Sequence, residues 1–126
     1  MKFEHFALNV PDARAMSFWY VDHLGMEILR GKEEPPYTKF LGDETGRVFV
    51  EFYTNPAVPI PDYAVLPPLN FHIGFAADDA RATQTRLESA GASLYREETL
   101  PDGTCLVMMR DPWGVPLQFC QRTNPF

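Results

Sequence analysis

The sequence predicts an α+β fold in which two tandem βαβββ modules form mixed half-sheets around one cup, with a central concave site and the helices outside. The first observation is an internal repeat, because the segment Phe3–Arg14 returns at a constant offset as Asn70–Arg81. The second is that both halves have the same order of expected elements: a strand, a helix and three strands. One such half cannot bury both of its faces alone, so we expect the halves to join around a shared concavity.

A proline-rich stretch separates the two halves. Residues 54–69 hold five of the 12 prolines, which favours an extended, semi-rigid crossover without regular structure. A chain of 126 residues is long enough to form one domain with a sizeable core. We therefore predict a single domain over residues 1–126, with module 1 at about 1–54, the linker at about 55–68 and module 2 at about 69–122.

The boundaries of the two expected helices are marked by residues that start and stop helices. Pro11 suits the first turn of a helix, and Gly25 suits its left-handed end. In the second half, Asp78 or Asp79 is the expected cap, and Gly91 ends the helix. Around these helices, alternation and turn signals predict strands at residues 2–10, 26–31, 37–41, 47–53, 69–76, 93–97, 105–110 and 115–122.

Composition and charge exclude several classes of function. The formal charge of −6 and the pI near 4.9 argue against nucleic acid, whose phosphates require a basic surface. No apolar run reaches the length of a membrane span, and no polybasic patch or signal peptide is visible. We therefore expect a cytoplasmic protein that binds a small molecule rather than a membrane or nucleic acid.

The two cysteines are expected to be reduced thiols in that compartment. If the last hairpin pairs symmetrically about Pro112 and Trp113, Cys105 lies opposite Cys120. No neighbouring base activates either thiol, so neither is a candidate nucleophile.

Four polar residues occupy equivalent places in the two halves. The repeat aligns His5 with His72 in the opening strands and Glu51 with Gln118 in the last strands. Side chains alternate along a strand, so all four are expected to point into the concave face. Two imidazoles, one carboxylate and one amide oxygen would suit a divalent cation such as Zn, Ni, Co, Mn or Fe. The alternatives are a structural role for each histidine and a Glu51 that faces solvent at a sheet edge.

Aromatic side chains share the expected concave face with Glu51. Phe49 and Tyr53 lie two positions to either side of it, and Phe40 lies in the preceding strand. Ligand pockets are mostly apolar with a few polar anchors, so these rings are candidate substrate-binding residues. Core filling is the competing interpretation of the same pattern.

The sequence resembles the glyoxalase/bleomycin-resistance/extradiol-dioxygenase group, the vicinal oxygen chelate superfamily, over essentially the whole chain. The resemblance rests on the following stretches: His5 with the helix from Asp12 to Gly25, Glu51 within Val48–Phe52, His72 with its helix, and Asp111–Phe119. It implies a pair of βαβββ modules that form a cup. It also implies a homodimer, because related proteins usually dimerise.

Carried over residue by residue, the resemblance implies a metal bound by His5, Glu51, His72 and Gln118. Glyoxalase I enzymes and extradiol dioxygenases have a glutamate at the fourth position. In glyoxalase I the metal binds the oxygens of a hemithioacetal while a carboxylate moves a proton between adjacent carbons. An amide cannot accept that proton at neutral pH, so Glu51 would be the only catalytic base.

Four functions are therefore open at the level of sequence, and one of them is a structural or regulatory ligand-sensing module, which is favoured only if no pocket exists between the half-sheets. The first is a metal-dependent lyase or isomerase of glyoxalase type with Glu51 as base. The second is a metal-free, small-molecule-binding protein of the bleomycin-resistance kind, in which no cofactor is needed. The third is an extradiol-type dioxygenase, whose two-histidine, one-carboxylate triad requires an acid at position 118.

Overall fold

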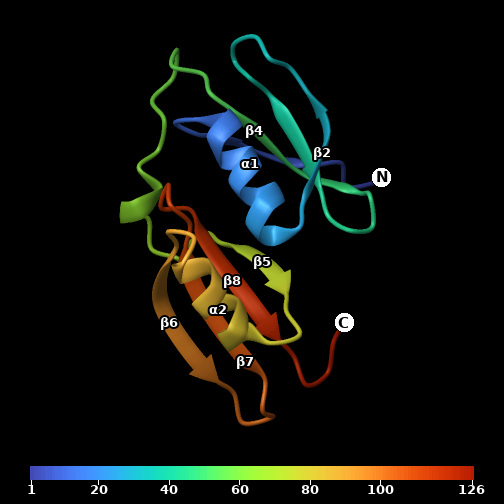
Figure 1. The fold of residues 1–126 in the computed structure, drawn as a ribbon, viewed down its shortest axis with the longest axis vertical. Helices are drawn as coiled ribbons and strands as arrows, with labels where there is room; N and C mark the ends of the chain where they lie inside the picture. Colours follow the sequence, from blue (N-terminus) through green and yellow to red (C-terminus); the bar gives the residue numbers. More distant parts are fainter. The chain divides into compact units, whose positions relative to one another are not determined.

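The computed structural model describes all residues from Met1 to Phe126, and it has the predicted α+β architecture with two mixed four-stranded sheets (Figure 1). The chain divides into two compact units, Met1–Pro61 and Asp62–Phe126. Each unit contains one βαβββ module. Neither helix has the length and apolar character that a membrane span requires.

The first unit has the sheet order β1-β4-β3-β2. Strand β1 runs parallel to β4, while β3 is antiparallel to both β4 and β2, so the sheet is mixed. Helix α1 packs on β3 and β4 (Figure 1). The elements are β1 (Phe6–Asn9), α1 (Ala13–Leu24), β2 (Glu27–Gly31), β3 (Lys39–Gly42) and β4 (Val48–Tyr53).

The second unit repeats this arrangement with the order β5-β8-β7-β6. Strand β5 is parallel to β8, and the other two pairings are antiparallel. Helix α2 packs against β6, β7 and β8 (Figure 1). The elements are β5 (Ile73–Ala76), α2 (Ala80–Glu88), β6 (Ser93–Thr99), β7 (Cys105–Arg110) and β8 (Pro116–Gln121).

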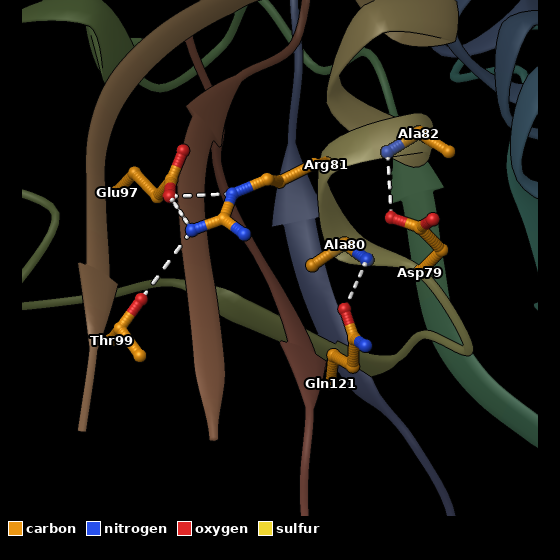
Figure 2. Close-up of polar contacts among 7 residues, drawn as sticks. All are labelled: Asp79, Ala80, Arg81, Ala82, Glu97, Thr99 and Gln121. Carbon is orange, nitrogen blue, oxygen red and sulfur yellow. Dashed lines mark hydrogen bonds and ion pairs between the residues drawn. The ribbon is translucent and has the colours of Figure 1, made fainter. Parts of the chain in front are cut away.

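Each helix begins at an aspartate in the same way. Asp12 accepts hydrogen bonds from the backbone N–H groups of Arg14 and Ala15, and Asp79 accepts one from Ala82 (Figure 2). These carboxylates satisfy N–H groups that have no partner inside the helix and complement its positive end. The sequence left Asp78 and Asp79 as alternatives, and the structure selects Asp79.

The repeat also preserves a contact between each helix and the end of the last strand of its sheet. The backbone N–H of Ala13 donates to Thr54 Oγ1 at 2.9 Å. At the equivalent place in the second unit, the backbone N–H of Ala80 donates to Gln121 Oε1 at 3.1 Å (Figure 2). The same figure shows α2 tied to the edge strand β6, because Arg81 Nε donates to Glu97 at 2.8 Å. The contacts of Ala13 and Ala80 fix each helix against the end of the strand that carries Glu51 or Gln118.

The apolar core of the first unit lies between α1 and one face of its sheet. Tyr20 is fully buried and packs edge-to-face on Phe52, with 4.9 Å between the ring centroids. Leu41 and Val50 are also fully buried. Because side chains alternate along a strand, Glu51 between Val50 and Phe52 must point to the other face. Core packing therefore sets the direction of the candidate site residue.

The proline-rich stretch was predicted to have no regular structure, but it contains one helical turn. The 3-10 helix η1 covers Tyr63–Val65. Arg110 at the end of β7 donates to the carbonyl oxygens of Tyr63 and Leu66, both at 2.8 Å, and holds this turn against the second sheet. Gly114 comes so close that a Cβ there would lie 2.6 Å from the backbone nitrogen of Ala64. Tertiary contacts thus override the local preference of prolines for extended structure.

The predicted register of the last hairpin was wrong by one residue. Cys105 pairs with Gln121, whereas Cys120 pairs with Leu106. The turn is centred on Trp113 alone, because Arg110 pairs with Pro116. A shift of one residue moves a side chain to the other face of the sheet, so the two free thiols lie on opposite faces.

Candidate metal centre

In the first unit, two neighbouring parallel strands bring a histidine and a glutamate together. Glu51 on β4 lies opposite Ala7 on β1, and His5 precedes Ala7 by two residues, so both side chains share one face of the sheet. The observed strand β1, Phe6–Asn9, is shorter than the strand predicted at residues 2–10, and His5 lies just before it. His5 Nε2 is 3.3 Å from Glu51 Oε2. The side chains are 28% and 20% exposed, so the pair is partly shielded from water but open to a ligand.

The other ring nitrogen of His5 has its own acidic neighbour. Its Nδ1 is in contact with the carboxylate of Glu4, the preceding residue. Phe40 packs edge-to-face on the imidazole, with centroids 5.3 Å apart, and lies opposite Glu51 in the β3–β4 pairing. Phe40 therefore limits the movement of the ring.

Phe49 and Tyr53 lie two residues to either side of Glu51 on β4. Both side chains are half-buried. The ring of Phe49 packs against Phe6, with 6.1 Å between the centroids. With Phe40, the two rings are candidates to hold the apolar part of a small molecule near Glu51.

The second unit brings His72 and Gln118 to one face of its sheet. Gln118 on β8 lies opposite Gly74 on β5, and His72 precedes Gly74 by two residues. His72 Nδ1 lies 2.8 Å from the carbonyl oxygen of Pro68. A carbonyl can only accept a hydrogen bond, so Nδ1 carries a proton, and in the neutral imidazole Nε2 keeps its lone pair. His72 is thus in the form that can bind a metal through Nε2.

Gln118 is accompanied by a thiol. Cys120 Sγ donates to Gln118 Oε1 at 3.4 Å. Burial raises the pKa of the Cys120 thiol, which keeps it protonated at neutral pH and able to donate. In the metal-free protein the thiol therefore acts as a hydrogen-bond donor to the amide oxygen of Gln118.

His72 and Gln118 line an open hollow of about 760 Å³ on the second sheet. This volume is in the range of small-molecule pockets, about 300–1,000 Å³. Its lining combines apolar and polar side chains, among them Phe75, Cys120, Arg122 and Phe126. The second unit therefore offers space for a ligand beside its two candidate metal ligands.

The donor atoms of the first unit have a separation that suits one divalent ion. Two ligands that each lie about 2.1 Å from an ion, at roughly 90–110° to one another, are about 2.9–3.4 Å apart. The 3.3 Å between His5 Nε2 and Glu51 Oε2 is in this range. The same distance exceeds the usual 2.7–3.2 Å or so of an N–H···O hydrogen bond. The residue types also suit a first-row divalent metal.

Neither unit alone gathers three His, Cys, Asp or Glu side chains into a group that could hold a metal ion. What each unit does provide is a pair, His5 with Glu51 and His72 with Gln118. The pairing within each unit follows from the parallel strands β1 and β4 in the first unit and β5 and β8 in the second. Glu4 and Cys120, which touch His5 and Gln118, were missed. The signals that could have found them were an acid next to one histidine and a thiol two residues from the glutamine.

Comparison with known proteins identifies the group to which the chain is related. Residues 2–119 match the family described as the glyoxalase/bleomycin resistance protein/dioxygenase superfamily. The chain belongs to this superfamily. The resemblance inferred from His5, Glu51, His72 and the segment Asp111–Phe119 is thereby confirmed.

Two curated relatives that match almost the full chain are both named lactoylglutathione lyase. The chain is 29% identical over 129 residues to the lactoylglutathione lyase of Haemophilus influenzae, which covers 98% of this chain and 95% of that protein. It is 27% identical to the lactoylglutathione lyase of Salmonella typhimurium, with coverage of 96% and 93%.

Solved structures show the same fold. Glyoxalase I from Zea mays superimposes with a TM-score of 0.75 at 24% identity over 98% of this chain, which spans only 45% of the maize protein. A glyoxalase family protein from Enterococcus faecalis gives a TM-score of 0.69 at 22% identity, with coverage of 94% and 96%. The tandem βαβββ fold predicted from the repeat is therefore confirmed.

Proposed function

We propose that the protein is a metal-dependent lyase or isomerase of glyoxalase type that acts on a small molecule. In this proposal His5, Glu51, His72 and Gln118 hold a divalent cation. The observation that carries it is the 3.3 Å separation of His5 Nε2 and Glu51 Oε2, a spacing suited to adjacent ligands of one ion. The curated relatives support it, because they match almost the full chain and are named lactoylglutathione lyases.

The bound cation would supply a Lewis acid that stabilises negative charge on a substrate oxygen. The remaining chemistry belongs to the side chains of this protein. Glu51 is the acid of the donor set, and its carboxylate takes a proton from a carbon next to a carbonyl and returns it to the adjacent carbon. The amide of Gln118 cannot accept a proton, so its role is to bind the cation and not to act as a base. Phe40, Phe49 and Tyr53 bind the apolar part of the substrate and exclude water around Glu51.

A complete site requires both pairs of ligands. We propose that all four ligands bind one ion, and that the protein works as a homodimer like related proteins. Donors from both modules would then surround the ion: two imidazoles, one carboxylate and one amide oxygen. This set carries one negative charge, which predicts weaker metal binding than a set with two carboxylates.

Metal analysis of protein purified without an affinity tag tests this proposal. We expect about one equivalent of a divalent metal per site after reconstitution, lost in His5→Ala and in Glu51→Ala. Glu34→Gln is the matched control, because Glu34 is exposed in the β2–β3 connection, at the end of the sheet away from His5. Occupancy below roughly a tenth of an equivalent, with no uptake on titration, would rule the proposal out.

Activity measurements then test the base. In metal-loaded protein, Glu51→Gln is expected to lower turnover of a glyoxalase-type substrate by about 10²–10⁴-fold, because general base catalysis contributes that much. Unchanged turnover in this variant would show that another group moves the proton. The assay uses the hemithioacetal formed from a 2-oxoaldehyde and glutathione, following the name of the curated relatives.

The second candidate function is metal-free binding of a small molecule. It is favoured by the open hollow of about 760 Å³ beside His72 and Gln118, whose lining mixes aromatic and polar groups. If this function is correct, adding a chelator should not change the affinity for the ligand, either in the wild type or in Glu51→Ala. The dioxygenase alternative has less support, because Gln118 stands where its carboxylate ligand is required.

A further inference from the structure

We propose that Glu4 is a positioning residue for His5. Its carboxylate holds the proton of the imidazole on Nδ1 and so turns the lone pair of Nε2 toward Glu51. The metal-binding part of this inference rests on the function proposed above, whereas the positioning of the ring does not.

The imidazole of His5 lies between two carboxylates. Glu4 is in contact with Nδ1, and Glu51 is 3.3 Å from Nε2. A neutral imidazole has one N–H, so it can donate to only one of them. The contact with Glu4 is the closer of the two, and the distance to Glu51 is long for a hydrogen bond. The proton therefore belongs on Nδ1, and an unshared pair on Nε2 faces the carboxylate of Glu51.

A lone pair opposite a carboxylate is an unfavourable arrangement unless a cation lies between them. A divalent ion bound by Nε2 and Oε2 removes this repulsion and uses both groups as ligands. Histidines that bind metals commonly donate their other N–H to a carboxylate or a carbonyl, which fixes the ring and raises its basicity. Glu4 is placed to play this part for His5.

The second module reaches the same form of its histidine by another contact. His72 Nδ1 is bonded to the backbone carbonyl of Pro68 at 2.8 Å. In the repeat, Phe71 stands where Glu4 stands in the first module, and its side chain cannot accept a hydrogen bond. Both histidines thus present Nε2, one through a charged side chain and the other through the main chain.

The difference between the two contacts matters for charge. The repeat places neutral Gln118 where the first module has Glu51, so one negative charge is missing from the donor set. Glu4 brings a carboxylate to the far side of the His5 ring, next to the proposed donor set. Glu4 therefore supplies part of the negative charge that Gln118 does not.

The test begins with metal-free, full-length protein, in which nitrogen NMR reports which ring nitrogen carries the proton. At alkaline pH we expect His5 of the wild type to carry it on Nδ1. In Glu4→Ala the proton should move largely to Nε2, where it can be donated to Glu51. Glu4→Gln should keep the wild-type form, because the amide oxygen still accepts from Nδ1. Glu34→Gln is the control and should leave the His5 signals unchanged.

Metal titration of the same variants completes the test, with Zn²⁺ and Co²⁺ as probes. Loss of the contact in Glu4→Ala should weaken binding about 10–100-fold, the usual effect of removing a partner of a metal-bound histidine. Glu4→Gln should fall between Glu4→Ala and the wild type, because it restores the hydrogen bond but not the charge. Glu4 is 77% exposed, so neither substitution threatens the fold.

The outcomes separate this inference from the proposed function. If Glu4→Ala leaves the proton of His5 on Nδ1, the positioning role is refuted, even if the wild type binds metal. If the wild type takes up no metal but Glu4→Ala moves the proton, the proposed function fails while the positioning of the ring by Glu4 is supported.

Discussion

Replacing Asp111 by alanine should destabilise the second module and loosen the turn that leads into β8. Asp111 is only 4% exposed, and its Oδ1 accepts hydrogen bonds from the backbone N–H groups of Trp113 and Val115, both at 2.9 Å. Val115 is fully buried, so its N–H would lose its acceptor without gaining water. The turn sets the register of β8 and therefore the place of Gln118.

Two hydrogen bonds to a charged acceptor contribute about 1.5–3 kcal/mol each, and the carboxylate no longer has to be desolvated in the variant. We therefore expect Asp111→Ala to lower the free energy of unfolding by about 2–4 kcal/mol. Asp111→Asn keeps one acceptor oxygen, and its loss should be about half as large. Asp22→Ala, at an exposed position on α1, is the control and should change stability by less than about 0.5 kcal/mol.

Guanidinium unfolding gives the free energies, and amide hydrogen exchange shows where the change occurs. The N–H of Val115 should exchange much faster in Asp111→Ala, whereas the amides of α1 in the first unit should not change. A loss below about 0.5 kcal/mol, or equal losses in the alanine and asparagine variants, would refute the view that this carboxylate holds the turn through its hydrogen bonds.

Three further predictions test the site, the linker contact and the pH dependence. Gln118→Glu should raise the affinity for Zn²⁺ at least about tenfold by adding a second carboxylate to the donor set, with Gln84→Glu on α2 as the control in the same calorimetric titration. Gly114→Ala should destabilise the protein more than Gly46→Ala does, because both residues have positive φ but only at Gly114 would a Cβ meet the backbone of Ala64; equal losses in thermal unfolding would contradict the contact. The backbone N–H and hydroxyl of Thr104 lower the pKa of Asp102 in the folded protein. The carboxylate therefore stabilises the fold above the ordinary carboxyl pKa, and this stabilisation is lost as the pH falls through the lower folded pKa. In urea unfolding, Asp102→Asn should lose less stability between neutral and acidic pH than the wild type or Asp22→Asn does.

The sequence predicted those features of the site that depend on periodicity. Alternation along β4 requires Glu51 to face away from Val50 and Phe52, and the repeat places His72 and Gln118 by the same rule. A period of two says nothing about side-chain rotation, so the contacts of Glu4 with His5 and of Cys120 with Gln118 were not predictable from spacing.

Errors in the prediction arose where tertiary contacts decide the outcome. The length of the turn around Trp113 depends on the hydrogen bonds that Asp111 accepts. The observed register differs from the predicted one by one residue, so Cys105 does not pair with Cys120. The turn η1 within the proline-rich stretch depends on Arg110, which lies far along the chain. The union of the two halves into one cup, with its metal ligands in contact, stays a prediction that metal titration will test.

The internal repeat explains the arrangement of each half-site, and its imperfections explain the proposed division of chemistry between them. In both modules a parallel pair of strands presents a histidine beside an oxygen donor, and a helix bonded to the end of the last strand holds that pair. In the first module two carboxylates lie against the histidine, those of Glu51 and Glu4. The second has a neutral amide, a protonated thiol and the open hollow. On the proposed function, proton transfer therefore belongs to the first module, while the second contributes neutral ligands and the space in which the substrate is held.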